Sequence, residues 1–119
     1  MAVSIQLYIS KKNFDVQKAE RFFKERRISY QRVDVLKFGI GKRELESVVA
    51  AVGLDAVCDK DSKAFRESVI AYTQNRDTIL SGLMEKPQLL KLPLVRNGRL
   101  ATVGYCPDVW EKWIEEKKI

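Results

Sequence analysis

The 119-residue sequence contains no histidine, only two cysteines and no long apolar run. Without histidine it lacks the commonest general base and metal ligand, so we expect no metal site. Cys58 and Cys106 match no metal-binding spacing and no disulfide framework, which favours a reducing, cytoplasmic location. No stretch approaches the roughly 18 apolar residues of a membrane helix, and the opening MAVSIQLYIS lacks the basic segment of a signal peptide. We therefore expect one soluble domain over residues 1–119, with no cofactor and no membrane partner.

The charge is unbalanced toward the basic side. Lys and Arg total 22 against 16 Asp and Glu, which gives a formal net charge of +6. The densest basic stretch is KERRISYQR, residues 24–32, while the C-terminal EKWIEEKKI mixes both signs. Because Lys- and Arg-rich helix faces are usually only solvated, this distribution argues against direct nucleic-acid binding and favours an acidic protein partner.

Apolar periodicity predicts an alternation of strands and helices. Alternating residues favour strands, and three- and four-residue spacing favours amphipathic helices, the first of which buries Val16, Ala19, Phe22 and Phe23. Strands are expected over residues 3–8, 29–35, 93–97 and 100–104, and helices over residues 15–27, 42–52, two stretches within 61–90, and 107–119. The first three elements form a β-α-β unit, whose two strands should be parallel.

Turn and cap residues set the boundaries of these elements. Asn97-Gly98, between two apolar runs, predicts a β-hairpin with a type I′ turn. Gly53 suits the end of the 42–52 helix, and Asn75 the start of a later one. Pro107 fits the first position of the last helix, whose buried stripe is predicted to comprise Val109, Trp110, Trp113 and Ile114.

Three motifs in order resemble the arsenate reductase/Spx family of thioredoxin-like proteins. They are Tyr8 followed by SKKNFDV and Gln17-Lys18-Ala19, then GLDAVCDKDSKAFRE, then LLKLPLVRNGRLATVGY. The resemblance spans nearly the whole chain. It implies an α/β fold with a thioredoxin-like four-stranded mixed sheet of order 2-1-3-4, flanked by helices, with a helical insertion at about 42–90. It also implies a cis peptide bond before Pro93.

The chain departs from the family pattern where the family's chemistry lies. The family's nucleophilic cysteine aligns with Asn13, its second cysteine with Val16, and a basic residue before its proline with Leu92. Arsenate reduction needs a thiolate that forms a covalent adduct, which an Asn carboxamide cannot supply. Asp15 also places a negative charge in the first helical turn, where an anion would otherwise be attracted. We therefore expect no arsenate reductase activity, and Asn13 is predicted to cap the helix.

Two functions follow from this pattern. The first is an inactive family member that acts as a binding or regulatory module for a protein partner, as the Spx branch does by contacting the transcription machinery. A docking face is predicted where the proline meets the first helix, and it comprises Lys11, Lys12, Phe14, Leu92, Pro93 and Tyr105. The second is a thiol oxidoreductase or redox sensor with a relocated cysteine, Cys106, whose pKa the last helix would lower.

Overall fold

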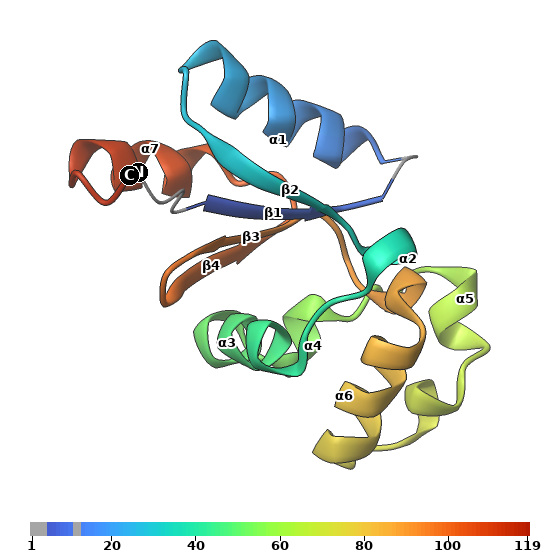
Figure 1. Cartoon of the computed structure of the whole chain (residues 1–119). Coiled ribbons are helices and arrows are strands. Elements are labelled where there is room, and N and C mark those ends of the chain that lie inside the picture. The colour runs from blue at the N-terminus through green and yellow to red at the C-terminus, as the bar shows by residue number, and fades with distance from the viewer. Residues whose placement is uncertain (1–4, 11–12) are drawn as a thin grey trace.

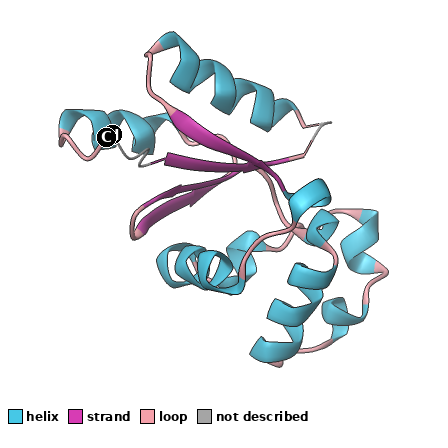
Figure 2. Ribbon diagram, viewed as in Figure 1, coloured by secondary structure: helices cyan, strands magenta, loops and turns pink. Residues whose placement is uncertain are grey.

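A computed structural model describes residues 5–10 and 13–119 of the chain. A mixed sheet of four strands, in the order β2-β1-β3-β4, carries helices on both faces (Figures 1 and 2). The strands are β1 (Ile5–Ile9), β2 (Tyr30–Asp34), β3 (Leu94–Asn97) and β4 (Leu100–Val103). The pair β1–β2 is parallel, and the other two pairs are antiparallel. This is the predicted sheet with the predicted order; the beginning of the first predicted strand lies outside the described residues.

The helices divide into those on the sheet and those beyond its end. Figure 1 shows α1 and α7 on one face, α3 and α4 on the other, and α5 and α6 past the end of the sheet. Their bounds are α1 (Phe14–Glu25), α2 (Val35–Phe38), α3 (Lys42–Val52), α4 (Leu54–Val57), α5 (Lys63–Arg66), η1 (Val69–Tyr72), α6 (Arg76–Glu85), η2 (Pro87–Leu89) and α7 (Pro107–Glu115). None of the helices formed by residues 5–10 and 13–119 has the length and apolar character needed to cross a bilayer.

The strand register assigns alternate side chains to opposite faces of the sheet. Ile5, Leu7 and Ile9 of β1 are fully buried on one face, where α1 and α7 pack. Tyr8 lies on the opposite face and bonds to Glu44 of α3. Because Gln6 pairs with both Gln31 and Arg96, these polar residues share the α3 face with Tyr8.

An aromatic cluster fills the space between the sheet, α1 and α7. Trp110 is fully buried, with its ring centroid 5.2 Å from Phe22 and 4.9 Å from Phe23. Its indole N–H donates to Thr102 Oγ1 at 2.9 Å, so the one polar atom of the ring is paired. Trp113 is also buried, as predicted, but Val109 is 40% exposed and is not part of the buried stripe.

Helix α1 ends in a Schellman motif. The Ile28 N–H donates to Phe23 O at 2.9 Å, and the Arg27 N–H donates to Lys24 O at 3.1 Å. Arg27 takes φ +57°, a left-handed conformation usually left to glycine. The tight turn brings the chain directly into β2.

The first helix, predicted over residues 15–27, ends at Glu25, and the last, predicted over residues 107–119, ends at Glu115. Two further predicted boundaries were also wrong. The second strand ends at Asp34, because the Asp34 carboxylate caps a helical turn, α2, that begins at Val35. The hairpin turn consists of Gly98 and Arg99, one residue later than predicted, and Asn97 still pairs with Leu100 in the ladder. Gly98 has φ +60° and Arg99 has no positive φ, so the turn is not of type I′.

Candidate functional site

The candidate site lies where β1 ends, α1 begins and β3 enters the sheet. Asn13 is the N-cap of α1, with extended backbone angles of φ −142° and ψ 119°. Its Oδ1 accepts hydrogen bonds from the backbone N–H of Asp15 at 2.9 Å and of Val16 at 3.2 Å. This is the predicted cap, and it pairs two of the free donors at the start of the helix.

The other half of the Asn13 carboxamide reaches across to β3. Its Nδ2 donates to Leu92 O at 3.2 Å, and Leu92 O belongs to the cis peptide bond before Pro93. The backbone continues the connection, because the Gly104 N–H donates to Pro93 O at 2.8 Å. One side chain therefore ties the start of α1 to the start of β3, and both ends of its amide are used in doing so.

Leu92, which the family resemblance aligns with a basic residue, lies in an apolar environment. Leu92 is only 6% exposed and belongs to the core, and Pro93 beside it is also buried. Lys91 is exposed, and its backbone N–H donates to Val57 O at 2.8 Å. Leu92 and Pro93 were predicted to form part of the docking face, but their burial leaves little of either side chain for a partner.

Cys106 is positioned at the N-terminus of α7 but makes no capping bond there. Its Sγ donates instead to Val103 O at 3.2 Å. Burial raises the pKa of the Cys106 thiol, and the charge of Asp15 adds to this, while the Thr102 and Val103 hydrogen bonds and Lys91 oppose it. The direction is opposite to the lowered pKa that the relocated-thiol hypothesis requires.

Cys58 is a buried residue at the end of α4. Its Sγ donates to Leu54 O at 3.4 Å, and burial raises its pKa as well. It forms an isolated antiparallel bridge with Leu90, which ties the helical region to the segment entering β3. Both thiols are free, and the described residues contain no cluster of three or more potential metal ligands.

Two predicted docking residues are exposed beside this site. Phe14 is 82% exposed and Tyr105 is 40% exposed. Lys18, one turn after Phe14 on α1, places its Nζ 5.7 Å from the centre of the Tyr105 ring, so the three side chains share one side of the molecule. Lys11 and Lys12, also predicted here, lie outside the described residues.

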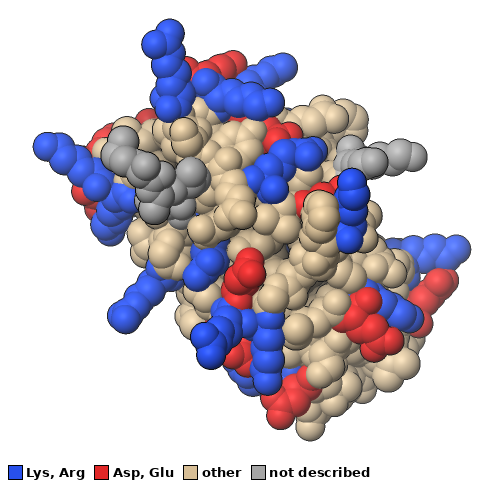
Figure 3. Space-filling view, in the orientation of Figure 1, with Lys and Arg blue, Asp and Glu red and all other residues tan. Residues whose placement is uncertain are grey.

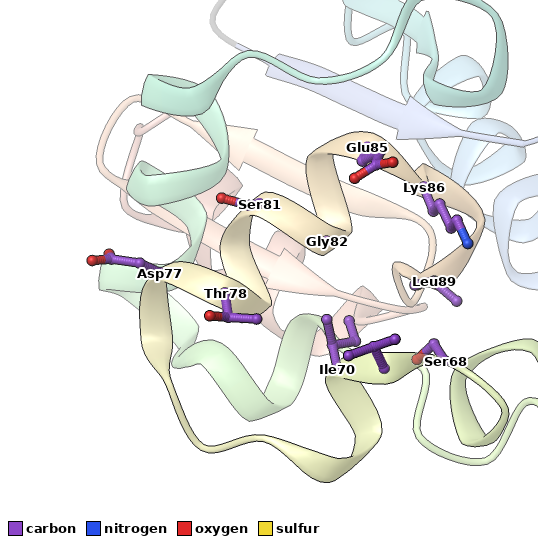
Figure 4. Close-up of a pocket in the computed structure, with 10 residues that line it drawn as sticks. Ser68, Ile70, Asp77, Thr78, Ser81, Gly82, Glu85, Lys86 and Leu89 are labelled. Atoms are coloured by element: carbon purple, nitrogen blue, oxygen red, sulfur yellow. The ribbon is translucent and has the colours of Figure 1, made fainter.

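A pocket of about 530 Å³ lies in the helical region, away from Asn13 (Figure 4). Ile70 of η1 packs against Gly82 of α6, where an added Cβ would lie 2.5 Å from Ile70 Cγ2. Ser81, Thr78 and Glu85 line the α6 side of the pocket. The close packing of η1 against α6 depends on the absence of a side chain at Gly82. The pocket shares no residue with the Asn13 junction.

A second cavity was not predicted from the sequence. It lies on the α3 face of the sheet and is lined by residues that include Gln6, Glu44 and Arg96. Polar residues at every second position of a strand ordinarily indicate a solvent-facing surface, so alternation alone could not identify it. The available signal was an arginine, Arg96, between the otherwise apolar Leu94–Val95 and the hairpin turn.

Comparisons with known proteins agree with this architecture. The family model described as the ArsC family matches residues 8–113. A relative, the global transcriptional regulator Spx 2 of Oceanobacillus iheyensis, is 26% identical over 104 residues, which cover 85% of this chain and 77% of the relative.

Several solved structures share the fold. An arsenate reductase from Vibrio cholerae has a TM-score of 0.82 at 19% identity, covering 94% of this chain and 98% of its own. An arsenate reductase-related protein from Brucella melitensis has a TM-score of 0.68 at 19% identity, covering 97% and 98% of the two chains. The family model covers most of the chain, and the sheet order and the cis bond before Pro93 agree with it. The chain therefore belongs to the ArsC family.

Proposed function

We propose that this chain is a catalytically inactive ArsC-family protein that acts in the cytoplasm as a binding or regulatory module for a protein partner. The observation that supports this most directly is the Asn13 junction. At the position of the family's nucleophile, the Asn13 carboxamide accepts two hydrogen bonds from α1 and donates one to Leu92 O. A group so occupied serves the structure, and it carries no lone pair soft enough to attack an oxyanion.

The surroundings of Asn13 support the same proposal. A thiol relay through either remaining cysteine is disfavoured, because burial raises the pKa of both Cys58 and Cys106. Leu92, where the resemblance places a basic residue, is buried. These features leave the fold intact and remove the groups that would bind and attack an oxyanion.

The exposed side of α1 offers a surface for a partner. Phe14, Lys18 and Arg21 recur at spacings of four and three residues, so they form one stripe on the helix. Phe14 is 82% exposed and Tyr105 flanks the stripe. Figure 3 shows Lys and Arg side chains over α1 at the top of the view. An acidic partner with an apolar anchor complements this surface. Spx 2, the matched relative, is a transcriptional regulator, so the transcription machinery is the first partner to test.

The catalytic half of the proposal is tested by assay. The purified protein, supplied with arsenate and either glutathione with glutaredoxin or thioredoxin with its reductase, should give no turnover above a blank. Asn13→Cys should not restore activity, because Leu92 and Asp15 still oppose an oxyanion. Measurable turnover by the wild-type protein would overturn the proposed inactivity.

The binding half is tested by capture from the native host, with and without reductant. We expect the same partner under both conditions, retained less by the double variant Phe14→Ala/Tyr105→Ala. Charge reversal at Lys11 and Lys12 should also weaken the complex and reduce its salt dependence. Tyr72→Ala is the matched control, because Tyr72 is 84% exposed in η1 and is not part of the predicted docking face. A partner held only without reductant, through a mixed disulfide, would instead support a thiol enzyme.

A further inference from the structure

The cavity on the α3 face has the composition of a ligand site. Its volume is about 440 Å³, and it lies against the sheet face opposite α1 and α7. Gln6, Gln31 and Arg96 line it from three neighbouring strands, and Phe38, Gly41 and Glu44 line it from the segment between β2 and the first turn of α3. Four side chains with hydrogen-bonding groups thus converge on one hollow, with an aromatic ring among the lining residues.

Two opposite charges line this cavity without pairing. The Arg96 guanidinium donates to Ser47 Oγ at 3.3 Å and to Gln6 Oε1 at 3.2 Å, which are both neutral acceptors. The Glu44 carboxylate accepts from the Tyr8 hydroxyl, a neutral donor. None of the ion pairs formed within residues 5–10 and 13–119 includes Arg96 or Glu44. Each charge is held by neutral groups and retains the capacity to bind an ion.

Tyr8 lies between the two charges. Burial raises its pKa first, then the hydrogen bond and charge of Glu44, while Arg96 lowers it from the other side. Tyr8 therefore keeps its proton and donates to Glu44 Oε2 at neutral pH. This leaves Glu44 Oε1 as the acceptor for another donor.

Gly41 provides room for that oxygen. A Cβ added at Gly41 would lie 2.9 Å from Glu44 Oε1. The Gly41 φ of −68° is open to any residue, so the backbone does not call for glycine there. Instead, the absence of a side chain at Gly41 leaves the space that Glu44 Oε1 occupies.

We propose that this cavity binds a free α-amino acid, with its carboxylate on Arg96 and its ammonium group on Glu44. A simple anion would meet the Glu44 charge, and a simple cation would meet Arg96, so a ligand carrying both charges fits best. Arg binds carboxylates through paired N–H groups, and Arg96 has donors beyond those used by Ser47 and Gln6. The Gln6 and Gln31 carboxamides add neutral donors and acceptors. Phe38, which is 74% exposed at the rim, can cover the apolar part of the ligand.

The test is a titration of the 15N-labelled protein with each of the twenty L-amino acids at millimolar concentration, followed by amide chemical shifts. At least one should give saturable shifts centred on Gln6, Gln31, Gly41 and Glu44. The methyl ester and the N-acetyl derivative of that amino acid, each lacking one charge, should bind about tenfold more weakly or worse.

Variants separate the cavity from general effects of charge. Glu44→Gln and Arg96→Gln should each weaken binding by about tenfold or more. Glu46→Gln on the same helix and Arg99→Gln in the hairpin turn make the same charge changes outside the cavity and should bind as the wild type does. The amide spectra of all four variants report whether they are folded. If Glu44→Gln does not fold, Gly41→Leu, which fills the space beside Glu44 Oε1, takes its place.

Three outcomes would overturn this proposal. They are no saturable shift with any amino acid, equal binding of the ester and N-acetyl derivatives, or unchanged affinity in both cavity variants. The site lies on the opposite face of the sheet from the Asn13 junction, so its failure would leave the proposed function standing, and the converse also holds.

Discussion

The two faces of the sheet are built on different principles. On the α1/α7 face, apolar side chains of β1 meet Phe22, Phe23 and Trp110, and the Trp110 N–H is paired with Thr102. On the α3 face, three neighbouring strands present Gln6, Gln31 and Arg96 to a cavity, and Tyr8 is buried on the same face. The first face is closed and held by packing. The second contains charges that are satisfied by neutral neighbours and remain accessible.

The two faces also differ in how much hydrogen-bonding capacity their polar side chains leave unused. The family resemblance places the catalytic residues at the α1 end of the closed face, and there Asn13 uses its whole side chain in structural bonds. On the open face, Glu44 and Arg96 have spare hydrogen-bonding capacity. Substitutions on the closed face should therefore change mainly stability, whereas substitutions of the polar residues that line the cavity should change stability less and binding more.

The largest effect is expected for Trp110→Ala. The substitution removes a fully buried indole that contacts Phe22 and Phe23, and it leaves the Thr102 hydroxyl without its partner. The free energy of unfolding should fall by about 3–5 kcal/mol, measured by urea denaturation. A loss below about 1 kcal/mol would show that this face is not the closed core described above.

The next effect concerns the cap on the same face. Asn13→Ala removes the two cap bonds and the bond to Leu92 O, and it should cost about 1–2 kcal/mol of unfolding free energy. Asn13→Asp keeps the cap acceptor but cannot donate to Leu92 O, so its loss should be smaller. Urea midpoints of the two variants give the comparison, and an equal loss in both would assign the stabilisation to the Leu92 bond alone.

On the open face, Tyr8→Phe tests the hydroxyl between the two charges. At neutral pH we expect a loss of about 1 kcal/mol, from the bond to Glu44. Burial and Glu44 raise the Tyr8 pKa, and burial followed by Glu20 raises the Tyr30 pKa to about 12. The folded protein thus holds protons that the unfolded chain releases near pH 10. Their stabilisation is complete below about pH 10 and is lost as the pH rises toward the folded-state values.

Urea midpoints measured at increasing alkaline pH check this linkage. The wild-type midpoint should fall as the pH rises above about 10, and the fall should be shallower in Tyr8→Phe, because that variant lacks one of the groups whose pKa is raised in the folded protein. The same slope in both proteins would mean that Tyr8 is not held protonated by its surroundings.

The smallest difference is expected between the two thiols. Cys106 lies at the start of α7 and Cys58 at the end of α4, yet burial raises the pKa of both. Iodoacetamide should therefore label both slowly at neutral pH, with rates that rise only in alkaline solution, as followed by mass spectrometry. Fast labelling of Cys106 alone at neutral pH would restore the hypothesis of a relocated reactive cysteine.

Local signals in the sequence were enough to predict most of the fold. The β-α-β unit follows from apolar periodicity, and the Asn13 cap from its place before an amphipathic helix. The helix predicted over residues 42–52 has the bounds observed for α3 (Lys42–Val52) and ends at Gly53. Each of these depends on residues that are close together in the chain, where pattern and propensity carry information.

The features that were missed depend on distant contacts. The hairpin turn is shifted by one residue from the predicted Asn97-Gly98. The side-chain Nδ2 of Asn97 donates to Lys118 O, a contact with a residue far away in the sequence. The α3-face cavity brings Gln6, Glu44 and Arg96 together from three separate elements. The Leu92 O contact of Asn13 likewise joins positions far apart, so the sequence predicted the cap but not the tie to β3.

The Asn13 tie also has an evolutionary consequence. The substitution Asn13→Cys, to the residue type that the family resemblance places here, would exchange a strong capping acceptor for a thiol, which accepts hydrogen bonds weakly, and would remove the donor to Leu92 O. The first step toward regained chemistry would therefore lower stability before any activity could return, since Leu92 would still lack a cation. Because proteins operate close to their stability threshold, a catalytic cysteine lost as proposed above would not be regained through this single substitution without a loss of stability.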